Sequence, residues 1–318
     1  MSATLIEPEA SKHAIEWPTL ALAAFIYGSW LALTCWHADV PVWLLIPAGG
    51  WLVCWHSSLQ HEVLHGHPTR NAALNRAIAL PPLALWLPFD RYRASHLQHH
   101  RDERLTDPLD DPESRYVTLE SWAQLGHLGQ MLVRAQSAMF GRLVIGPFWA
   151  AGGFFISEAR ALIAGEPGRR LLWARHLAAA AVVVAWLSLV CGMSLWLYIA
   201  GFVIPGTSLM LIRSFAEHRA ESAVSRRTAI VEAYGPLALL FLFNNLHAAH
   251  HARPAIPWYR LPGFYRANRA AFVGAERGPF YAGYRDVFRR FLLRAHDKPI
   301  HPLGRIPVKR AERAMEDA

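Results

Sequence analysis

The feature that most restricts the fold is a set of long apolar runs that follow one another in pairs. The first pair covers about residues 17–36 and 40–60, and the second covers about 174–192 and 193–213. Each run is close to the roughly 20 residues that a helix needs to cross a bilayer. Because only a short joint separates the runs of a pair, each pair must fold as a helical hairpin. The sequence therefore predicts an all-α integral membrane protein with four transmembrane helices in two hairpins.

Two hairpins would place the N-terminus, the segment 61–173 and the C-terminus on one side of the membrane. That side is rich in arginine, which indicates the cytoplasmic face. The arginines concerned are Arg70, Arg76, Arg91, Arg93, Arg101, Arg104, Arg169 and Arg170. The segments outside the hairpins are therefore expected to form a helical cap on the cytoplasmic side.

The remaining chain is divided by its composition. Residues 1–16 form a polar segment, 17–290 a membrane domain, and 291–318 a charged tail that is expected to be solvated. Two apolar stretches inside the domain, 77–89 and 143–157, are interrupted by proline or glycine, so we expect interfacial or re-entrant segments there.

A third apolar stretch, residues 230–246, is expected as a helix lying at the interface.

The composition limits the classes of partner. The formal net charge is +8, but no nucleic-acid reading module accompanies the arginines, so nucleic acid is not an expected partner. The basic loops fit an anionic cytoplasmic leaflet instead. Cys35, Cys54 and Cys191 lie in apolar stretches without CxxC spacing, which argues against a disulfide framework or a thiolate metal site. Usage rich in arginine and alanine and poor in lysine suggests a bacterial inner membrane.

Three short clusters contain eight histidines: His61-Glu62-Val63-Leu64-His65, His96-Leu97-Gln98-His99-His100 and His247-Ala248-Ala249-His250-His251. Each cluster repeats histidine at i and i+4, and the last two add one at i+3. On a helix these offsets fall on one face. Neutral imidazole is the commonest metal ligand, and eight imidazoles are more than one ion needs. The clusters therefore predict a site for two metal ions.

The first cluster, read alone, permits another chemistry. His61-Glu62-x-x-His65 is also the signature of a zinc peptidase, in which the glutamate acts as base. Such an enzyme has no use for the further clustered histidines, whereas iron suits several imidazoles and open positions for dioxygen. With few carboxylates in the clusters, Glu62 is expected to accept an imidazole N–H rather than to bind metal. His67 lies off the i, i+4 face and is expected to be structural or a neighbour of a ligand.

The three clusters resemble the histidine boxes of the membrane fatty acid desaturase superfamily, which includes acyl-lipid desaturases, carotenoid ketolases and related hydroxylases. The order, the spacing and the intervening hairpin match over about residues 40–255. The resemblance implies a non-haem di-iron centre, two iron ions that use dioxygen to attack an unactivated C–H bond in a lipid. It also implies a ninth histidine after the last span, where His218 stands.

The resemblance thus implies a metal-ligand set of His61, His65, His96, His99, His100, His218, His247, His250 and His251. By analogy with acyl desaturases, one iron would take His61, His100, His218 and His251, and the other would take the remaining five. Acyl-CoA desaturases carry an asparagine one turn before the ninth histidine, where this chain has Ser214. A serine can still hold a water on iron.

Polar side chains near the boxes are candidates for orienting the imidazoles, because metal-bound histidines usually donate their second N–H. Asp102, Asp107 and Asp111 follow the second box, and Asn244 and Asn245 precede the third box by about one turn.

These features predict oxygen-dependent oxidation of a lipid C–H bond, with desaturation of an acyl chain as the first interpretation. A lipid or carotenoid hydroxylase or ketolase is the alternative within the superfamily. A membrane zinc protease and a non-catalytic metal-binding or lipid-sensing protein are alternatives outside it. The electrons must come from another protein, because the chain shows no flavin, nicotinamide or iron–sulfur motif. A ferredoxin- or rubredoxin-like donor suits a basic cytoplasmic face.

Overall fold

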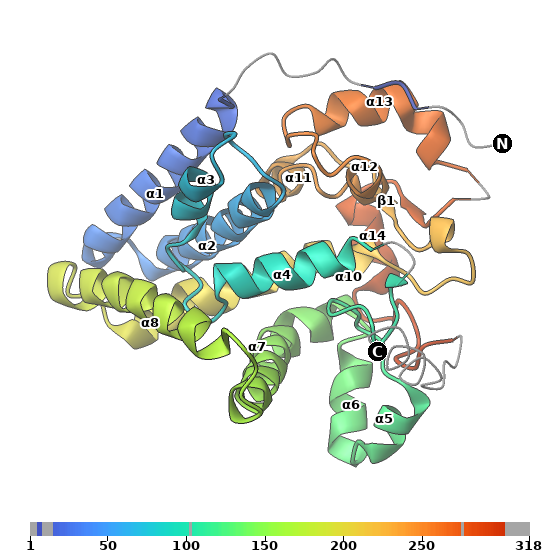
Figure 1. Ribbon diagram of the computed structural model, residues 1–318, viewed down its shortest axis with the longest axis horizontal. Helices are drawn as coiled ribbons and strands as arrows, with labels where there is room; N and C mark the ends of the chain where they lie inside the picture. The colour runs from blue at the N-terminus through green and yellow to red at the C-terminus, as the bar shows by residue number, and fades with distance from the viewer. Residues whose placement is uncertain (1–4, 8–14, 102–103, 275–276, 303–318) are drawn as a thin grey trace.

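The computed structural model describes residues 5–7, 15–101, 104–274 and 277–302, and in these ranges the chain is mostly helical (Figure 1). Five helices are long and apolar enough to cross a membrane. They are α1 (Trp17–Cys35), α2 (Val42–Leu64), α7 (Met139–Ile163), α8 (Arg169–Ala185) with its π-helical continuation Trp186–Val190, and the continuous helix Leu195–Glu217. The last of these consists of α9 (Leu195–Tyr198), a π-helical turn (Ile199–Val203) and α10 (Ile204–Glu217).

The four predicted runs all lie in these helices, but the count of four spans is not confirmed. The expected re-entrant stretch 143–157 lies in the middle of α7, a helix of 25 residues. Its Pro147 does not end the helix, because proline and glycine are tolerated in apolar helices whose freed backbone groups find other partners. The two sides of the membrane therefore remain a prediction.

The other elements are short and form the part of the structure beyond the long helices. They are α3 (Ala72–Ala79), α4 (Phe89–His99), α5 (Leu119–Gln124), α6 (His127–Ala135), β1 (Ile230–Val231), α11 (Pro236–Leu240), α12 (His247–Ala252), α13 (Leu261–Phe272), β2 (Phe280–Tyr281) and α14 (Tyr284–Phe291). The two strands pair in parallel, with Ile230 opposite Phe280. In the view of Figure 1, α4 crosses the centre, with α11 and α12 above it and α10 partly behind it.

The prediction of a helix over residues 230–246 is wrong. This segment contains β1, the single short helix α11 and a tight turn in which Leu242 and Phe243 have positive φ. The Asn245 side chain donates to the carbonyls of Val231 and Ala233, at 2.7 and 3.0 Å. Hydrogen bonds to strand and loop backbone thus replace those of a continuous helix.

The apolar stretch 77–89 begins in the last turn of α3 and then continues without helical structure until α4 begins at Phe89. Tyr198 Oη donates to the carbonyl of Leu83 (2.7 Å), and the ring of His176 bonds the carbonyl of Leu85 (2.8 Å). The segment therefore packs against the second pair of long helices, and the backbone groups that no helix satisfies are bonded by their side chains.

The polar N-terminal segment and the charged tail lie largely outside the described residues. Where the tail is described, it is not simply solvated. His296 and His301 are buried, and the backbone of residues 296–301 bonds Ser137 and Val117. The start of the tail therefore packs against the segment around α5 and α6.

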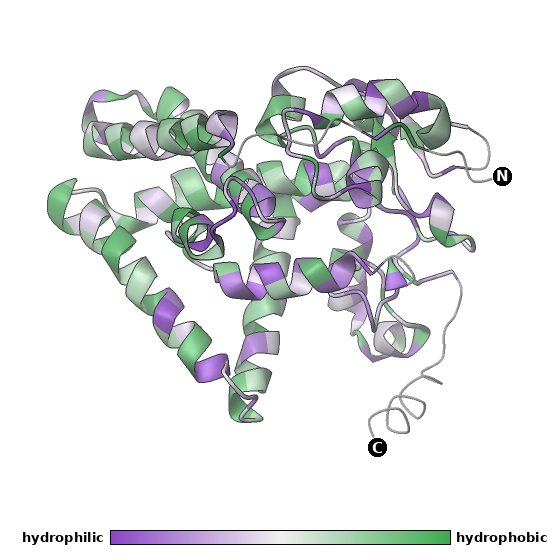
Figure 2. Cartoon of the chain, turned by 45° about the horizontal axis from the view of Figure 1, so that its top comes forward, coloured by the Kyte–Doolittle hydropathy of each residue, from purple (hydrophilic) through white to green (hydrophobic). Residues whose placement is uncertain are grey.

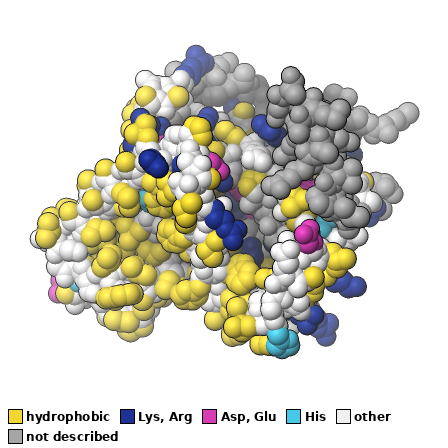
Figure 3. Space-filling view, turned by 60° about the horizontal axis from the view of Figure 1, so that its bottom comes forward, with side chains coloured by type: hydrophobic (Ala, Val, Ile, Leu, Met, Phe, Trp, Pro, Cys, Tyr) yellow, Lys and Arg dark blue, Asp and Glu magenta, His cyan; other side chains and the backbone are white. Residues whose placement is uncertain are grey.

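Hydropathy separates the two parts of the structure. Figure 2 shows hydrophobic colour along most of the long helices and hydrophilic colour concentrated among the shorter elements. On the face drawn in Figure 3, apolar side chains cover one half of the surface, and lysine and arginine lie mainly outside that half. This separation fits a membrane protein with a polar cap.

The two helices that end at the first box and at His218 are in close contact. A Cβ at Gly206 of α10 would lie 2.7 Å from the Val53 Cβ of α2, and a Cβ at Gly49 of α2 would lie 2.5 Å from the Phe202 ring. Small residues at such crossings let helix backbones approach closely in membrane proteins. The glycines therefore set the distance between the ends of α2 and α10.

Replacing Gly206 by alanine should destabilise the protein, because its Cβ would overlap Val53 Cβ and the helices would have to separate. Overpacking of this kind costs about 1–3 kcal/mol. The midpoint of thermal denaturation in detergent, followed as loss of the monodisperse peak, should fall for Gly206→Ala. It should not fall for Gly28→Ala, because a Cβ at Gly28 meets nothing within 4 Å. Equal midpoints for the two variants would contradict the close packing.

Candidate metal centre

The histidine boxes lie at the ends of four helices that converge. His61 is in the last turn of α2 and His65 follows it, the second box ends α4, His218 follows α10, and the third box forms most of α12. Helix ends that meet in this way bring together side chains that are far apart in sequence, such as His99 and His218.

The structure gathers all nine predicted histidines into two groups. The first group contains His61, His65, His96, His100 and His250, and the second contains His99, His218, His247 and His251. Within each group the candidate ligand atoms all lie within 4.8 Å of one another. Five of the nine are fully buried, and the other four are half-buried.

The spacing of the ring nitrogens fits metal binding. In the first group, His100 Nε2 lies 3.0 Å from His96 Nε2 and 3.2 Å from His250 Nε2. In the second, His218 Nε2 lies 2.9 Å from the Nε2 atoms of both His99 and His247. Two nitrogens that bind one ion at about 2.1 Å, about 90° apart, would be separated by about 3.0 Å.

One buried atom supports the same conclusion. His65 Nε2 is buried and has no hydrogen-bond partner among the described residues. A buried polar nitrogen without a partner costs free energy, and a metal ion would supply the missing contact. The donor set, neutral imidazoles with carboxylates behind them, suits iron or zinc.

The two groups differ from the division of histidines that the resemblance implies. His61 and His100 lie with the first group, not with His218 and His251. The reason is helical geometry, because residues at i and i+4 lie one above the other on a helix. The i, i+4 pair of each box therefore stays in one group, while the i+3 histidines, His99 and His250, join the opposite group.

Two carboxylates orient the second box. His99 Nδ1 donates to Asp111 Oδ1 (2.8 Å), and His96 Nδ1 donates to Glu113 Oε1 (3.0 Å). With Nδ1 bonded, Nε2 of each ring is turned into its group. Such carboxylate–histidine pairs fix the tautomer and the orientation of metal ligands. The Asp111 carboxylate also accepts the backbone N–H groups of Thr106 and Glu113, which holds it in place.

The third box is oriented from α10 and from the turn before α12. His247 Nδ1 lies 3.2 Å from Asn244 Oδ1 and 3.3 Å from Glu217 Oε1. Asn244 Nδ2 donates to the same Glu217 oxygen (3.3 Å), and Arg213 forms an ion pair with Glu217 at 3.0 Å. Arg213 and Glu217 are both buried, so the ion pair neutralises charges that could not be left alone there.

The other predicted partners do not orient histidines among the described contacts. Glu62 accepts the backbone N–H of Trp258 (3.0 Å), and Asp107 accepts those of Leu109 and Asp110 in its own loop. Asn245 bonds the β1 segment, as described above.

Ser214 and Asp102 also lack a shown role at the centre. Ser214 lines a small cavity beside His218, but its hydroxyl is 3.5 Å from the Leu211 carbonyl oxygen. Asp102 lies outside the described residues. His67, expected to be structural, bonds Glu16 Oε1 through Nδ1 at 2.6 Å and joins neither group.

Burial keeps most of the rings neutral, as metal ligands must be. Burial lowers the pKa of His65 to about 2 and holds the pKa values of His247 and His250 well below the usual range. Burial alone would also lower the pKa of His99, but the charges of Glu113 and Asp111 outweigh it and raise that pKa to about 9. A metal ion would have to displace the proton of His99.

Glu113, Arg213 and Glu217 were not predicted as parts of the site. Glu113 stands in the acidic loop after the second box, and Glu217 directly precedes His218, so closeness in sequence was a usable signal for both. Arg213 had only a weaker signal, its i, i+4 spacing from Glu217.

Comparison with known proteins agrees with this geometry. A family model described as fatty acid desaturase matches residues 36–284. The chain is also similar to a beta-carotene ketolase of Paracoccus sp. (strain PC1), with 26% identity over 269 residues, which cover 76% of this chain and 90% of the relative. The match to the family includes all three boxes, His218 and four of the five helices that could span a membrane, whereas α1 ends at Cys35, just before the matched residues. The chain is therefore a membrane oxidoreductase that belongs to the fatty acid desaturase family.

Proposed function

We propose that the nine histidines hold two iron ions, one in each group, and that the protein uses dioxygen to oxidise a C–H bond in a lipid. The observation that carries this proposal is the convergence of nine imidazoles into two compact groups. A zinc peptidase has no use for a second group, and its catalytic glutamate would be Glu62, whose carboxylate accepts the backbone N–H of Trp258.

When bound, the two irons would supply the activation of dioxygen for attack on an unactivated C–H bond. The chain's own residues orient the imidazoles for metal binding. Asp111, Glu113 and Glu217 face Nδ1 atoms and turn Nε2 atoms into the groups. Burial of both groups excludes water, which would otherwise compete for reactive species.

The electrons come from outside in this proposal, and a ferredoxin- or rubredoxin-like protein is the donor. The support is the basic balance of the chain, 32 basic against 24 acidic residues, which attracts an acidic partner at low ionic strength. The site lies on the cytoplasmic side of a bacterial inner membrane, where the arginine-rich segments favour retention.

Desaturation of an acyl chain is the reaction we place first. Oxygenation of a carotenoid, as a ketolase or hydroxylase, is the second candidate, and the similarity to the beta-carotene ketolase favours it. Both reactions use the same metal ligands, so the position of the substrate C–H bond decides between them.

The products distinguish the two reactions. The protein should be expressed in bacterial cells with and without β-carotene production, and the extracted lipids compared by mass spectrometry. Desaturation gives acyl chains that have lost two hydrogens, whereas carotenoid oxygenation gives pigments that have gained oxygen. The matched control is His250→Ala, which removes one ring from the first group and should abolish either product while the protein still inserts. Normal product with His250→Ala would refute the ligand assignment.

Metal content tests the two groups separately. The purified protein should contain about two irons per chain by elemental analysis, as in di-iron carboxylate proteins. The double variant His65→Ala/His100→Ala should lose the ion of the first group and keep about one iron, because His99, His218, His247 and His251 remain. About one zinc and no iron, after growth with iron available, would overturn the proposal and favour the protease alternative.

Asp111 should matter for the site in a way that Asp107 does not. Asp111→Asn removes the charge that His99 Nδ1 bonds, and loss of such a partner typically lowers metal affinity or activity about 10–100-fold. Asp107→Asn leaves all nine histidines untouched, because Asp107 Oδ1 bonds only loop amides. Iron retention during dialysis against a chelator measures the effect. Equal retention by both variants would show that Asp111 does not support His99.

A further inference from the structure

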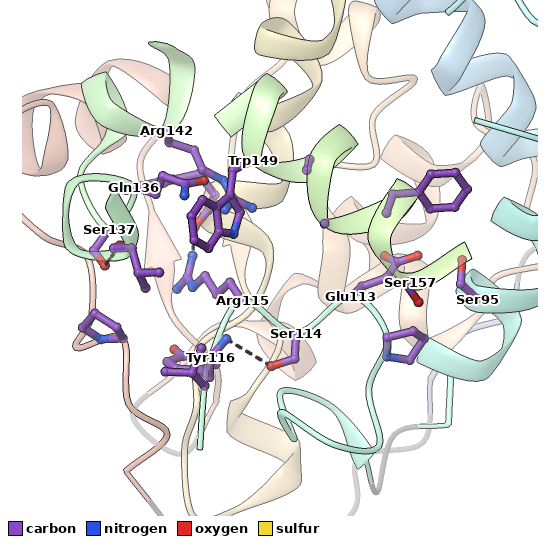
Figure 4. A pocket seen from close by; sticks show the side chains of 18 of the residues that line it. Ser95, Glu113, Ser114, Arg115, Tyr116, Gln136, Ser137, Arg142, Trp149 and Ser157 are labelled. Atoms are coloured by element: carbon purple, nitrogen blue, oxygen red, sulfur yellow. Dashed lines mark hydrogen bonds between the residues drawn. The ribbon is translucent and has the colours of Figure 1, made fainter. Parts of the chain in front are cut away.

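A cavity lined by described residues lies outside the two histidine groups. Its volume is about 560 Å³, within the usual range for small-molecule sites. It lies between α4, the loop at residues 112–117, the end of α6, α7 and the described start of the C-terminal tail. Figure 4 shows Gln136, Arg142 and Trp149 together at one end, with Glu113 and Ser157 at the other.

One end of the cavity is cationic and lacks a counter-ion. Arg142 Nε is buried and has no hydrogen-bond partner, and Arg142 forms no ion pair within the described part of the chain. Arg115 lies beside it in the lining, but Arg115 is already paired with Asp297. A guanidinium that is partly buried, with its Nε buried and unpartnered, is costly without an anion, so an anionic group is the partner that this end lacks.

Gln136 provides an independent sign of a missing ligand. Its side chain is only 7% exposed, yet its Oε1 atom has no hydrogen-bond partner in the described structure. This oxygen lies near the Arg142 stem, because both are close to the Cβ position of Gly146, at 3.8 and 3.6 Å. The Gln136 amide can therefore contact the same bound group as Arg142.

The carboxylates of the lining are not available to Arg142. Glu113 accepts from His96 Nδ1, and Asp297 accepts from Arg115 and from Tyr116 Oη (2.9 Å). Both acids are thus engaged elsewhere, and the cationic charge of this end stays uncompensated.

Apolar rings form a wall along the cavity between the end at Arg142 and the polar end at Glu113 and Ser157. Trp86, Trp149 and Phe154 line it, and the rings of Trp86 and Phe154 meet edge to face at 5.5 Å. On α7 the lining runs from Arg142 to Ser157, which at 1.5 Å per residue spans about 22 Å. A charged end followed by a long apolar wall fits an acyl chain with an anionic head.

We propose that this cavity binds a lipid that carries an anionic oxygen head group, carboxylate or phosphate, on an acyl chain. The head lies against Arg142 and Gln136, and the chain follows α7 past Trp149 and Phe154. Because α7 is one of the five helices that could span a membrane, a lipid of the bilayer reaches the cavity along this helix. None of the nine histidines lines the cavity, although Arg142 also lines the small cavity that contains His218 and Glu217.

Lipid binding to the purified full-length protein, measured by native mass spectrometry from neutral detergent, tests the proposal. Dioleoylphosphatidylglycerol and oleate are the anionic probes, and dioleoylphosphatidylcholine is the neutral-head control. The protein should bind at least one anionic probe about tenfold or more tightly than the control, as expected for hydrogen bonds to a charged group. Equal binding of all three lipids would refute the anionic head.

Two pairs of variants locate the site. Arg142→Gln should remove the preference for the anionic probes, whereas Arg134→Gln, an exposed arginine stacked on Trp122 outside the cavity, should keep it. Gly153→Leu should weaken binding, because Gly153 lines the cavity and a Cβ there meets nothing within 4 Å. Gly152→Leu places the same side chain beside the cavity lining and should bind normally.

Three results would overturn the assignment. An unchanged preference in Arg142→Gln, with normal folding, would place the head group elsewhere. Unchanged binding in Gly153→Leu would place the chain elsewhere. Displacement of the lipid by an equal concentration of inorganic phosphate would show that only a small anion binds. Because Arg142 also lines the small cavity beside His218, iron content is measured on the same variants. A variant that keeps its iron and loses the lipid preference concerns the lipid cavity alone and leaves the proposed function untouched.

Discussion

The metal centre depends on hydrogen bonds that orient its buried imidazoles. One ring nitrogen, Nδ1, bonds a side chain outside the group, and the other, Nε2, points into the group. A buried ring nitrogen without a partner is costly, and crowding several such nitrogens together increases that cost. Asp111, Glu113 and Glu217 each face one outer nitrogen. Backbone amides in turn hold Asp111, and Arg213 holds Glu217. The Nε2 atoms are left facing one another at a spacing that suits the ligands of one metal ion. A bound cation would relieve the cost of crowding these nitrogens together.

This arrangement requires helix ends that stay in register. The tight contacts of Gly49 with Phe202 and of Gly206 with Val53 fix α2 against α10, and these helices lead to the first box and to His218. The third box is fixed differently, because Asn244 and Asn245 bond α10 and β1 just before α12 begins. Helix packing and side-chain hydrogen bonds thus divide the task of positioning the two groups.

Most of the candidate metal centre and part of the fold could be predicted from the sequence. The i, i+4 histidines are local patterns, so they predict a shared face without knowledge of tertiary structure. His218 could be predicted as a ligand only from the resemblance, because a single histidine forms no repeat at i and i+4. The length of α7 was missed because Gly152 and Gly153 were taken as a break in the helix. The tight turn at Leu242 was missed because an apolar run does not reveal positive φ.

The grouping of the nine histidines follows helix geometry more closely than it follows the analogy with acyl desaturases. An i, i+4 pair lies one above the other on a helix, whereas an i+3 ring is rotated away from the i+4 ring. In each of the three boxes the i, i+4 pair lies in one group, and His99 and His250 are the two rings that cross over. The analogy with acyl desaturases assigned them otherwise because it carried over positions without regard to helix geometry.

Two arginines of the long helices differ in whether an acidic side chain of the protein pairs with them. Arg213 lies in α10 and pairs with Glu217 one turn later, as an arginine needed only for structure should. Arg142 lies in α7, faces a cavity of about 560 Å³, and has no such acid. Glu158 of the same helix is buried and bound by Arg91 and Arg169, so the other buried charge of α7 does have partners within the chain. The missing partner of Arg142 is therefore best explained by a ligand.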